Sequence, residues 1–259
     1  MRTTAIALVL AAAVGVGACG AGESGSQGST STVEATAEAP TGSYEGADGV
    51  VSSIEDTSRI VSLNGDLTET IFALGAGDRV VGIDLTTTYP AQAAALPDVG
   101  LGRNLNAEAV IGLSPTLVIG DTQVEPITAI EQIRAAGIPV VILRAEVTLE
   151  GVIRKIGNVG EILDLPAEAS ALAEEVQAEI DDAVALAATA TSEPRAAYLY
   201  VRGPETLLLF GNGMPTHFLI DAASAVDAAG DVGVVFAENL SAERLVTAAP
   251  EILITPEEG

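Results

Sequence analysis

The chain has 259 residues, of which 48% are hydrophobic, and its formal net charge is −25 because 36 acidic side chains outnumber 11 basic ones. So large an excess of negative charge repels phosphates, which argues against nucleic acid and anionic lipid surfaces as partners. No P-loop, Gly-x-Ser-x-Gly or His-Glu-x-x-His sequence occurs, and the single histidine has no reactive thiol to act with, so the common ATPase and hydrolase chemistries are excluded.

The first 18 residues predict a signal peptide. Arg2 precedes an apolar run over 5–16, which is shorter than the ~20 residues that span a bilayer and therefore indicates export rather than a permanent span. The small residues Gly17 and Ala18 stand directly before Cys19, the only cysteine, in an arrangement that resembles the bacterial lipobox. A lone thiol in an oxidising compartment favours a lipid anchor on Cys19 over an ordinary signal peptide that happens to contain cysteine.

Residues 19–50 predict a flexible tether. After the cysteine the chain consists mostly of Gly, Ser, Thr, Ala and Glu, so it buries too little apolar surface to offset its ordering entropy. About 30 residues of this kind span on the order of 30 Å, enough to lift a domain clear of lipid headgroups. Tyr44 is the only aromatic residue of the segment, and no role is assigned to it.

Residues 51–166 alternate between strand-like and helix-like patterns. Short apolar runs predict strands, and segments with helical spacing, several of them followed by glycine, predict the helices between them. The predicted strands cover 59–63, 79–83, 116–119 and 139–143, and the predicted helices cover 66–74, 106–113, 126–136 and 149–163. This alternation indicates a parallel sheet covered by helices, that is, a Rossmann-like α/β lobe.

A long helix and a second α/β pattern follow. Residues 167–190 are rich in Ala and Glu without a helix breaker, which predicts a helix of roughly 35 Å. Residues 191–259 contain predicted strands over 195–201, 206–210 and 251–254 and a helix over 216–223. The predicted fold class is therefore α/β, with two lobes joined by one helix and a ligand held between them. We expect the second lobe to be incomplete at its C-terminus, because no helix follows its last predicted strand.

The order of these segments resembles the bacterial ABC-transporter substrate-binding proteins with a rigid helix between two lobes, which capture cobalamin, siderophores or haem. The resemblance covers residues 59–259 and rests on three segments, which are 59–63, 68–82 and 105–118. It implies a monomeric binding protein outside the cytoplasmic membrane that works with a membrane permease and its ATPase subunit.

Within that superfamily, the segments 198–203 and 209–213 resemble the haem-binding branch. The resemblance implies that a Tyr-x-Arg pair at the start of the second lobe faces the ligand, and here the pair is Tyr200 and Arg202. A phenolate is a hard anionic ligand suited to ferric iron, and a nearby guanidinium favours the ionised phenol. Tyr198 shares the strand face by parity, so the resemblance alone selects Tyr200 as the iron ligand.

Three further residues are candidates for haem support. Some related binders supply a histidine from the loop that spans 100–105 here, and in this chain Arg103 is available there to pair with a haem propionate. Coordination by Tyr200 alone, a water in the sixth position and a different ligand all stay open. His217 either offers an imidazole to iron or, more commonly for such a residue, packs or caps a helix. Tyr89, which precedes a proline, either stacks on the porphyrin or is a turn residue.

Two acidic residues are candidates for docking to the permease. Glu69 matches the acidic residue with which the family contacts permease arginines, and Asp221 is its candidate counterpart in the second lobe. The alternative for each is a solvated helix carboxylate. The strong motif around Glu69 favours docking, whereas the other acidic residues near Asp221 favour the alternative. Such exposed ion pairs orient partners more than they add affinity.

The sequence thus predicts a non-enzymatic lipoprotein on the outer face of the cytoplasmic membrane that binds haem as transported cargo and delivers it to an ABC permease. A first alternative keeps the fold and changes the ligand to a ferric siderophore or cobalamin, since only the segment Tyr200-Val-Arg202 argues for haem. A second alternative is an acidic adhesion or structural lipoprotein. That role would use the same anchor and tether, but no adhesin-type repeat is present and the two-lobe pattern would be unexplained.

Overall fold

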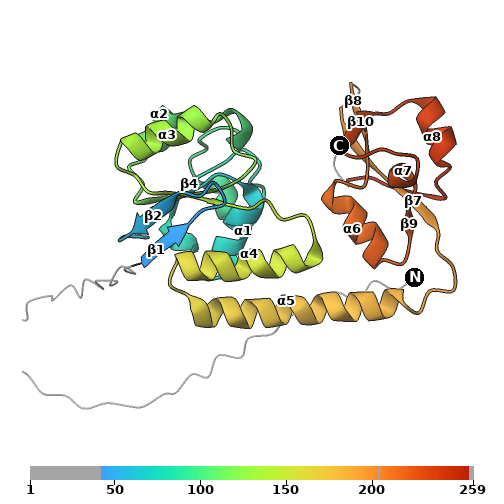
Figure 1. Cartoon of the computed structure of the whole chain (residues 1–259), viewed down its shortest axis with the longest axis horizontal. Helices are drawn as coiled ribbons and strands as arrows, with labels where there is room; N and C mark the ends of the chain where they lie inside the picture. The colour runs from blue at the N-terminus through green and yellow to red at the C-terminus, as the bar shows by residue number, and fades with distance from the viewer. Residues whose placement is uncertain (1–41, 204, 257–259) are drawn as a thin grey trace, which may run out of the picture. The chain divides into compact units, whose positions relative to one another are not determined.

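The computed structural model of the protein describes residues 42–203 and 205–256 (Figure 1). The predicted signal peptide and Cys19 lie outside these ranges. Within them, no helix combines the length and the apolar character that crossing a membrane requires.

The described chain begins with an antiparallel hairpin of β1 (Gly42–Glu45) and β2 (Val51–Ile54). Tyr44 packs against the core of the first lobe, and its partial burial, followed by the nearby charge of Glu161, raises the pKa of its phenol. Ile54 is buried in the same core. The prediction of a flexible tether is therefore wrong for residues 42–50, because the two apolar side chains anchor a segment whose average composition is polar.

The first lobe is built on a four-stranded, fully parallel sheet in the order β4-β3-β5-β6. The strands are β3 (Ile60–Ser62), β4 (Val80–Ile83), β5 (Leu117–Asp121) and β6 (Val140–Leu143). All residues of β5 and β6 are buried, as expected for parallel strands that are covered on both faces. The predicted strands and the predicted parallel arrangement are confirmed.

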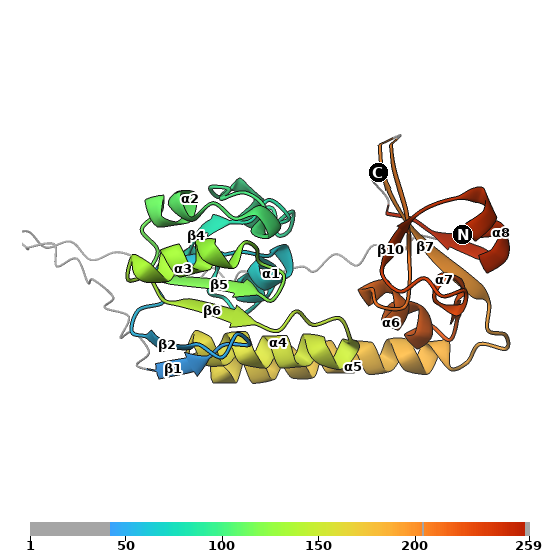
Figure 2. The same cartoon turned by 45° about the horizontal axis from the view of Figure 1, so that its top comes forward.

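Helices cover both faces of this sheet. They are α1 (Gly65–Ala73), α2 (Ala107–Gly112), α3 (Ile127–Ala135) and α4 (Leu149–Ile162), joined in part by short 3-10 helices η1 (Gly77–Arg79), η2 (Ala93–Ala95) and η3 (Gly102–Asn104). Apolar side chains of α1 and α4 share one core cluster with the sheet, and those of α2 and α3 share a second. Figure 2 shows β5 and β6 lying between α3 and α4.

Side-chain caps define where three of these helices begin. Asn64 accepts from the backbone N–H of Asp66, Asn106 from that of Glu108, and Thr148 from that of Gly151. Each predicted helix of the first lobe begins and ends within one residue of its observed bounds. α5 (Pro166–Ala187) follows with proline in its first turn and packs beside α4 (Figure 1).

The second sheet is mixed rather than parallel throughout. Its strands are β7 (Arg195–Arg202), β8 (Thr206–Phe210), β9 (Val226–Asp227), β10 (Ala237–Asn239) and β11 (Ile252–Ile254). The order is β10-β8-β7-β11, with β9 also beside β7. β8 pairs antiparallel with β7 and β10, whereas β9 and β11 run parallel to β7. The α/β fold class predicted from the sequence is confirmed.

Three helices accompany the second sheet, and its core is small. They are α6 (Pro215–Ala222), α7 (Ala228–Asp231) and α8 (Ala242–Ala248), of which only α6 was predicted. The buried cluster consists of Ala197, Leu199, Leu209, Ala228, Ala229, Val234 and Ala248. The three residues of β11 are all exposed, between 39% and 50%. The β11 edge of this sheet therefore carries apolar side chains that the rest of the described chain leaves exposed to solvent.

Candidate functional site

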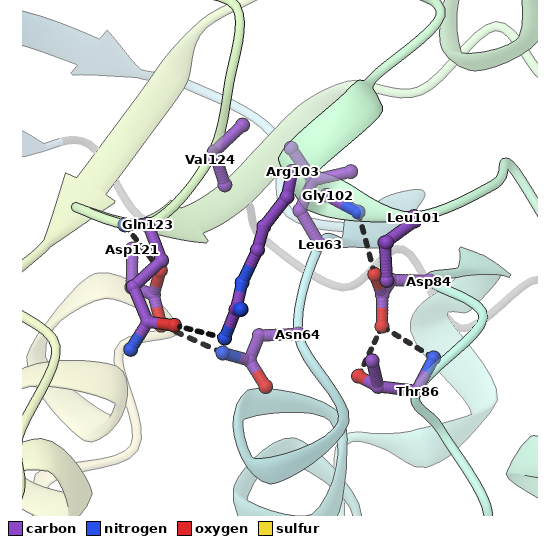
Figure 3. Close-up of a pocket in the computed structure, with 10 residues that line it drawn as sticks. All are labelled: Leu63, Asn64, Asp84, Thr86, Leu101, Gly102, Arg103, Asp121, Gln123 and Val124. Carbon is purple, nitrogen blue, oxygen red and sulfur yellow. Dashed lines mark hydrogen bonds between the residues drawn. The ribbon is translucent and has the colours of Figure 1, made fainter. Parts of the chain in front are cut away.

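A polar pocket of about 140 Å³ lies at the carboxyl ends of β3, β4 and β5 (Figure 3). Asn64 follows β3, Asp84 follows β4 and Asp121 ends β5, so three adjacent strands each deliver one polar side chain to the same edge. In open α/β sheets this edge is where ligands bind, because the loops that leave the strands diverge there. The pocket is therefore the candidate ligand site of the first lobe.

Asp121 forms one wall of the pocket and is only 5% exposed. Its carboxylate accepts hydrogen bonds from Nδ2 of Asn64 at 2.6 Å and from the backbone N–H of Gln123 at 2.8 Å. Burial raises the pKa of Asp121, while these two hydrogen bonds and the positive charge of Arg103 act in the opposite direction. The same Asn64 side chain caps α1, so the pocket wall and the start of that helix are held by one residue.

Asp84 forms the opposite wall and is 2% exposed. Its carboxylate accepts from the backbone N–H groups of Gly102 and Thr86, both at 2.7 Å, and from the Thr86 hydroxyl. Gly102 lies so close to the end of β3 that an added Cβ would stand 2.7 Å from the carbonyl oxygen of Leu63. Asp84 and this close approach therefore hold the 3-10 helix η3 against the sheet.

Arg103 follows Gly102 in η3 and lines the pocket from an exposed position. Its guanidinium donates to Oε1 of Gln123 at 2.8 Å, and Figure 3 shows it reaching across the pocket toward Gln123 and Asn64. Gln123 in turn is placed by its backbone bond to Asp121. Arg103, which the sequence predicted as a haem-support residue, thus belongs to a continuous network that runs through Gln123 and Asp121 to Asn64.

Tyr200 lies on β7 in the second sheet. The antiparallel register sets it against Leu208 of β8, and its ring stacks on Phe210 with centroids 5.7 Å apart and planes 12° apart. Tyr198 is on the same strand face and its ring lies 5.3 Å from that of Phe210. Arg202 ends the strand at an exposed position. The alternation predicted for Tyr198, Tyr200 and Arg202 on one face is therefore present.

Tyr89 and Glu69 lie together in a different hollow, of about 660 Å³. Phe72, Asp78 and Gln92 also line it, and Tyr89 is 64% exposed. From the sequence, Tyr89 is a candidate for stacking on haem or a turn residue, and Glu69 is a candidate for docking to the permease or a solvated carboxylate. The structure instead brings the two residues to one surface, and Tyr89 is not among the residues that line the pocket around Arg103.

His217 and Asp221 both lie on α6 and line a third hollow, of about 520 Å³. Nδ1 of His217 lies 3.0 Å from Oδ2 of Asp227. Asp227 is buried and also accepts from two backbone N–H groups at the start of α7. His217 thus joins α6 to the start of α7, which is the packing role that the sequence reasoning left open for it. In the described ranges no group of three or more His, Cys, Asp or Glu side chains is arranged to hold a metal ion.

Four polar residues of the first-lobe pocket and one ring of the second sheet were not predicted as site residues. They are Asn64, Asp84, Asp121, Gln123 and Phe210. A usable signal exists for the three residues that end or follow strands, because a polar side chain directly after a buried parallel strand lies at the ligand edge. Phe210 lies within the segment 209–213 that resembles the haem-binding branch, but nothing in that segment singles out its ring, and no local pattern marks Gln123.

Solved structures of high similarity are haem-binding proteins. The periplasmic heme-binding protein RhuT from Roseiflexus sp. RS-1, in its apo form, is 41% identical with a TM-score of 0.75, and the match covers 78% of each chain. The heme binding protein HmuT is 32% identical with a TM-score of 0.78, over 86% of this chain and 74% of that one. These two proteins are similar to the chain in sequence as well as in fold.

Curated relatives are substrate-binding proteins too, and one of those described here is named for another ligand. A cobalamin-binding protein of Halobacterium salinarum is 32% identical over 210 residues, which cover 77% of this chain and 54% of that protein. The ABC transporter substrate-binding lipoprotein YvrC of Bacillus subtilis is 28% identical, over 78% of this chain and 64% of its own length. The chain thus spans about half to two thirds of these curated relatives. Residues 60–257 match the family described as periplasmic binding protein, and the chain therefore belongs to the periplasmic binding protein family.

Proposed function

We propose that this protein is the haem-binding component of an ABC import system, which captures haem outside the cytoplasm and delivers it to a membrane permease driven by an ATPase subunit. The observation that carries the proposal is the Tyr200-Val-Arg202 segment on β7, in a chain that is 41% identical to a haem-binding protein. Solved variants of HmuT replace a tyrosine and an arginine two positions after it, which is the same spacing.

In this proposal the Tyr200 phenolate binds ferric iron, and the positive charge of Arg202 favours the ionised phenol. Tyr200 is partly buried on its strand. Arg103 supports the haem through a propionate carboxylate, since a guanidinium and a carboxylate form charge-assisted hydrogen bonds. His217 is a candidate support residue only through Nε2, because Nδ1 already faces Asp227.

The same proposal assigns permease docking to Glu69 and Asp221. Both residues are exposed, Glu69 on helix α1 and Asp221 on helix α6, and each lines an open hollow. Tyr89 shares the hollow of Glu69, so a contact with the permease competes with haem stacking as its role. Glu69→Gln is expected to leave haemin binding in solution unchanged and to lower haem uptake by cells. Unchanged uptake would remove Glu69 from the docking surface.

The family acts outside the cytoplasm, and we propose that a lipid on Cys19 holds this member at the outer face of the membrane. Expression of the full chain and of Cys19→Ser, followed by cell fractionation, tests the anchor. The parent is expected in the membrane fraction and the variant in the soluble fraction. The same distribution for both would exclude an anchor on Cys19.

An optical titration of the protein with haemin tests the ligand, with Tyr200→Phe as the variant and Tyr198→Phe as the matched control. Each change removes one hydroxyl from the same strand face and keeps the ring. A saturable phenolate-to-iron band is expected in the parent and in Tyr198→Phe, and its loss is expected in Tyr200→Phe. Loss of the band in Tyr198→Phe instead would move the iron ligand to Tyr198.

Cobalamin is the second candidate ligand, favoured by the 32% identity to the cobalamin-binding protein of Halobacterium salinarum. A parallel titration with aquocobalamin separates the two ligands. Saturable binding of cobalamin together with no spectral change on adding haemin would replace the proposal. A ferric siderophore, the other ligand considered, is tested in the same way.

A further inference from the structure

Three aromatic side chains share the face of the second sheet that carries Tyr200. They are Tyr198 and Tyr200 on β7 and Phe210 on β8, and each is partly buried. Leu199 and Leu209 point to the other face, where they are buried in the third core cluster. The three rings therefore form a layer of their own, separate from the hydrophobic core of this lobe.

Phe210 lies on the neighbouring strand β8, with its ring close to both tyrosines of β7. Its ring centroid is 5.3 Å from that of Tyr198, with the planes tilted by 35°, and 5.7 Å from that of Tyr200, with the planes only 12° apart. Both separations fall in the range over which aromatic rings attract one another. On the side away from β7, Phe210 is paired with Ala237 of β10, which has no ring that could stack on Phe210.

The backbone that carries Phe210 is held tightly. The next residue, Gly211, donates its N–H to the carbonyl oxygen of Phe236 at 2.8 Å, and an added Cβ at Gly211 would collide with the carbonyl group of Val234. The preceding residue, Leu209, is 0% exposed and is anchored in the core. The ring of Phe210 therefore projects from a backbone with little freedom, which suits it to orient a neighbour.

We propose that Phe210 is a positioning residue that sets the ring plane of Tyr200, and that Tyr198 supports Phe210 through its own ring contact without binding iron. The inference rests on the proposed function, in which Tyr200 binds the haem iron. A near-parallel stack restricts rotation of the Tyr200 ring, so its oxygen meets the ligand in one orientation. Without the Phe210 ring, the phenol would sample more orientations and lose that freedom on binding.

The test is a haemin titration of Phe210→Leu and Phe210→Tyr beside the parent protein. Leucine keeps an apolar side chain but removes the stack, so haemin is expected to bind about three- to tenfold more weakly. The phenolate-to-iron band is expected to shift or broaden in the same variant, because the Tyr200 oxygen meets the iron in a less uniform geometry. Phe210→Tyr restores the ring and is expected to restore both the affinity and the band.

Phe218→Leu is the matched control. Phe218 lies on α6 in the same lobe, and its ring pairs edge-on with His217 rather than with a tyrosine of β7. This change removes an aromatic pair without altering the stack on Tyr200, so the band is expected to stay unchanged. Thermal unfolding of every variant checks the fold, and Phe210→Met, which fills irregular space, replaces Phe210→Leu if that protein does not fold.

The outcomes separate this inference from the function on which it rests. If the parent shows no saturable haemin band, the proposed function fails and the role of Phe210 fails with it. If the parent binds haemin and Phe210→Leu has the same affinity and the same band, only the role of Phe210 is overturned. Equal weakening in Phe210→Leu and Phe218→Leu with an unchanged band would also overturn it, because loss of lobe stability would then explain both.

Discussion

The two sheets of this protein place their candidate ligand residues in different ways. In the first sheet, every residue of β5 is buried, and the buried carboxylates at the strand ends accept short hydrogen bonds from the Asn64 side chain and from the backbone N–H of Gly102. In the second sheet, β8 has one fully buried residue and β11 has none, and the candidate iron ligand is held by ring stacking on an open face.

The difference shows two ways to prepare a binding surface. A buried hydrogen-bond network positions its members strongly, because breaking any one bond leaves a desolvated polar group without a partner. Ring stacking costs less to disturb and leaves the aromatic face open to a flat ligand. We therefore expect changes in the first lobe to act mainly on stability and changes on the aromatic face of the second sheet to act mainly on the ligand.

The largest expected effects come from alanine substitutions at adjacent positions of β5 and of β8, which compare the two sheets directly. Val118 and Ile119 point to opposite faces of β5 and are both 0% exposed, so Ile119→Ala is expected to cost about 4 kcal/mol of unfolding free energy and Val118→Ala about 2.5 kcal/mol. On β8, Leu209→Ala is expected to cost about 3 kcal/mol, but Leu208→Ala only about 1 kcal/mol. Urea unfolding measures all four. A large cost for Leu208→Ala would show that the aromatic face is a second core.

Asp84→Ala is expected to give the next largest effect. The substitution removes an acceptor from two backbone N–H groups and one hydroxyl at a position that is 2% exposed, so we expect a loss of about 3 kcal/mol in urea unfolding. Asp78→Ala, at an exposed position in η1, is the control and is expected to change stability by less than about 0.5 kcal/mol. Equal effects at the two positions would contradict a network that positions η3.

Much of the fold follows from local pattern, because alternating apolar runs and glycine stops mark the strands and helices of the first lobe. The hairpin of β1 and β2 was missed since only Tyr44 and Ile54 supply apolar anchors in it. β10 and α8 were missed because short, partly exposed elements leave little periodicity to detect. The antiparallel pairing of β8 with β7 was likewise not predicted from the alternation of the segments.

The candidate site could be predicted only in part, because its contacts join residues far apart in the chain. Arg103 was predicted as a site residue from its place in the loop over 100–105. Its hydrogen-bond partner Gln123 was not predicted, because Gln123 is positioned by Asp121. Asp121 in turn contacts Asn64 only because β3 and β5 are neighbours in the sheet. That neighbourhood is a property of the strand order, which no local sequence pattern contains. The role of Phe210 was not predicted for the same reason, since its stack on Tyr200 depends on the register between β7 and β8.

Asp121→Asn is expected to change how stability depends on pH, with a smaller effect than that of Asp84→Ala. Burial raises the pKa of Asp121 in the folded protein, so the folded state holds this proton more tightly than the unfolded chain does. The stability that protonation contributes is therefore present at low pH and is lost as pH rises from the ordinary aspartate range through the raised pKa. Urea unfolding of both proteins between about pH 3 and pH 7 should show this loss in the parent and its absence in Asp121→Asn. Identical slopes would mean that the carboxylate is ionised without penalty.

The smallest expected effect tests whether the network of the first lobe acts on the ligand at all. Gln123→Ala removes the acceptor that holds the Arg103 guanidinium, and we expect haemin to bind about two- to threefold more weakly because Arg103 is then less often in place. In the Arg103→Ala background the same change should have no further effect, since the two residues act on the ligand through one contact. Haemin titration of the two single variants and the double variant measures this coupling. Additive losses would mean that Gln123 contacts the ligand independently of Arg103. The hydrogen-bond network of the first lobe would then not be what positions Arg103 for the ligand.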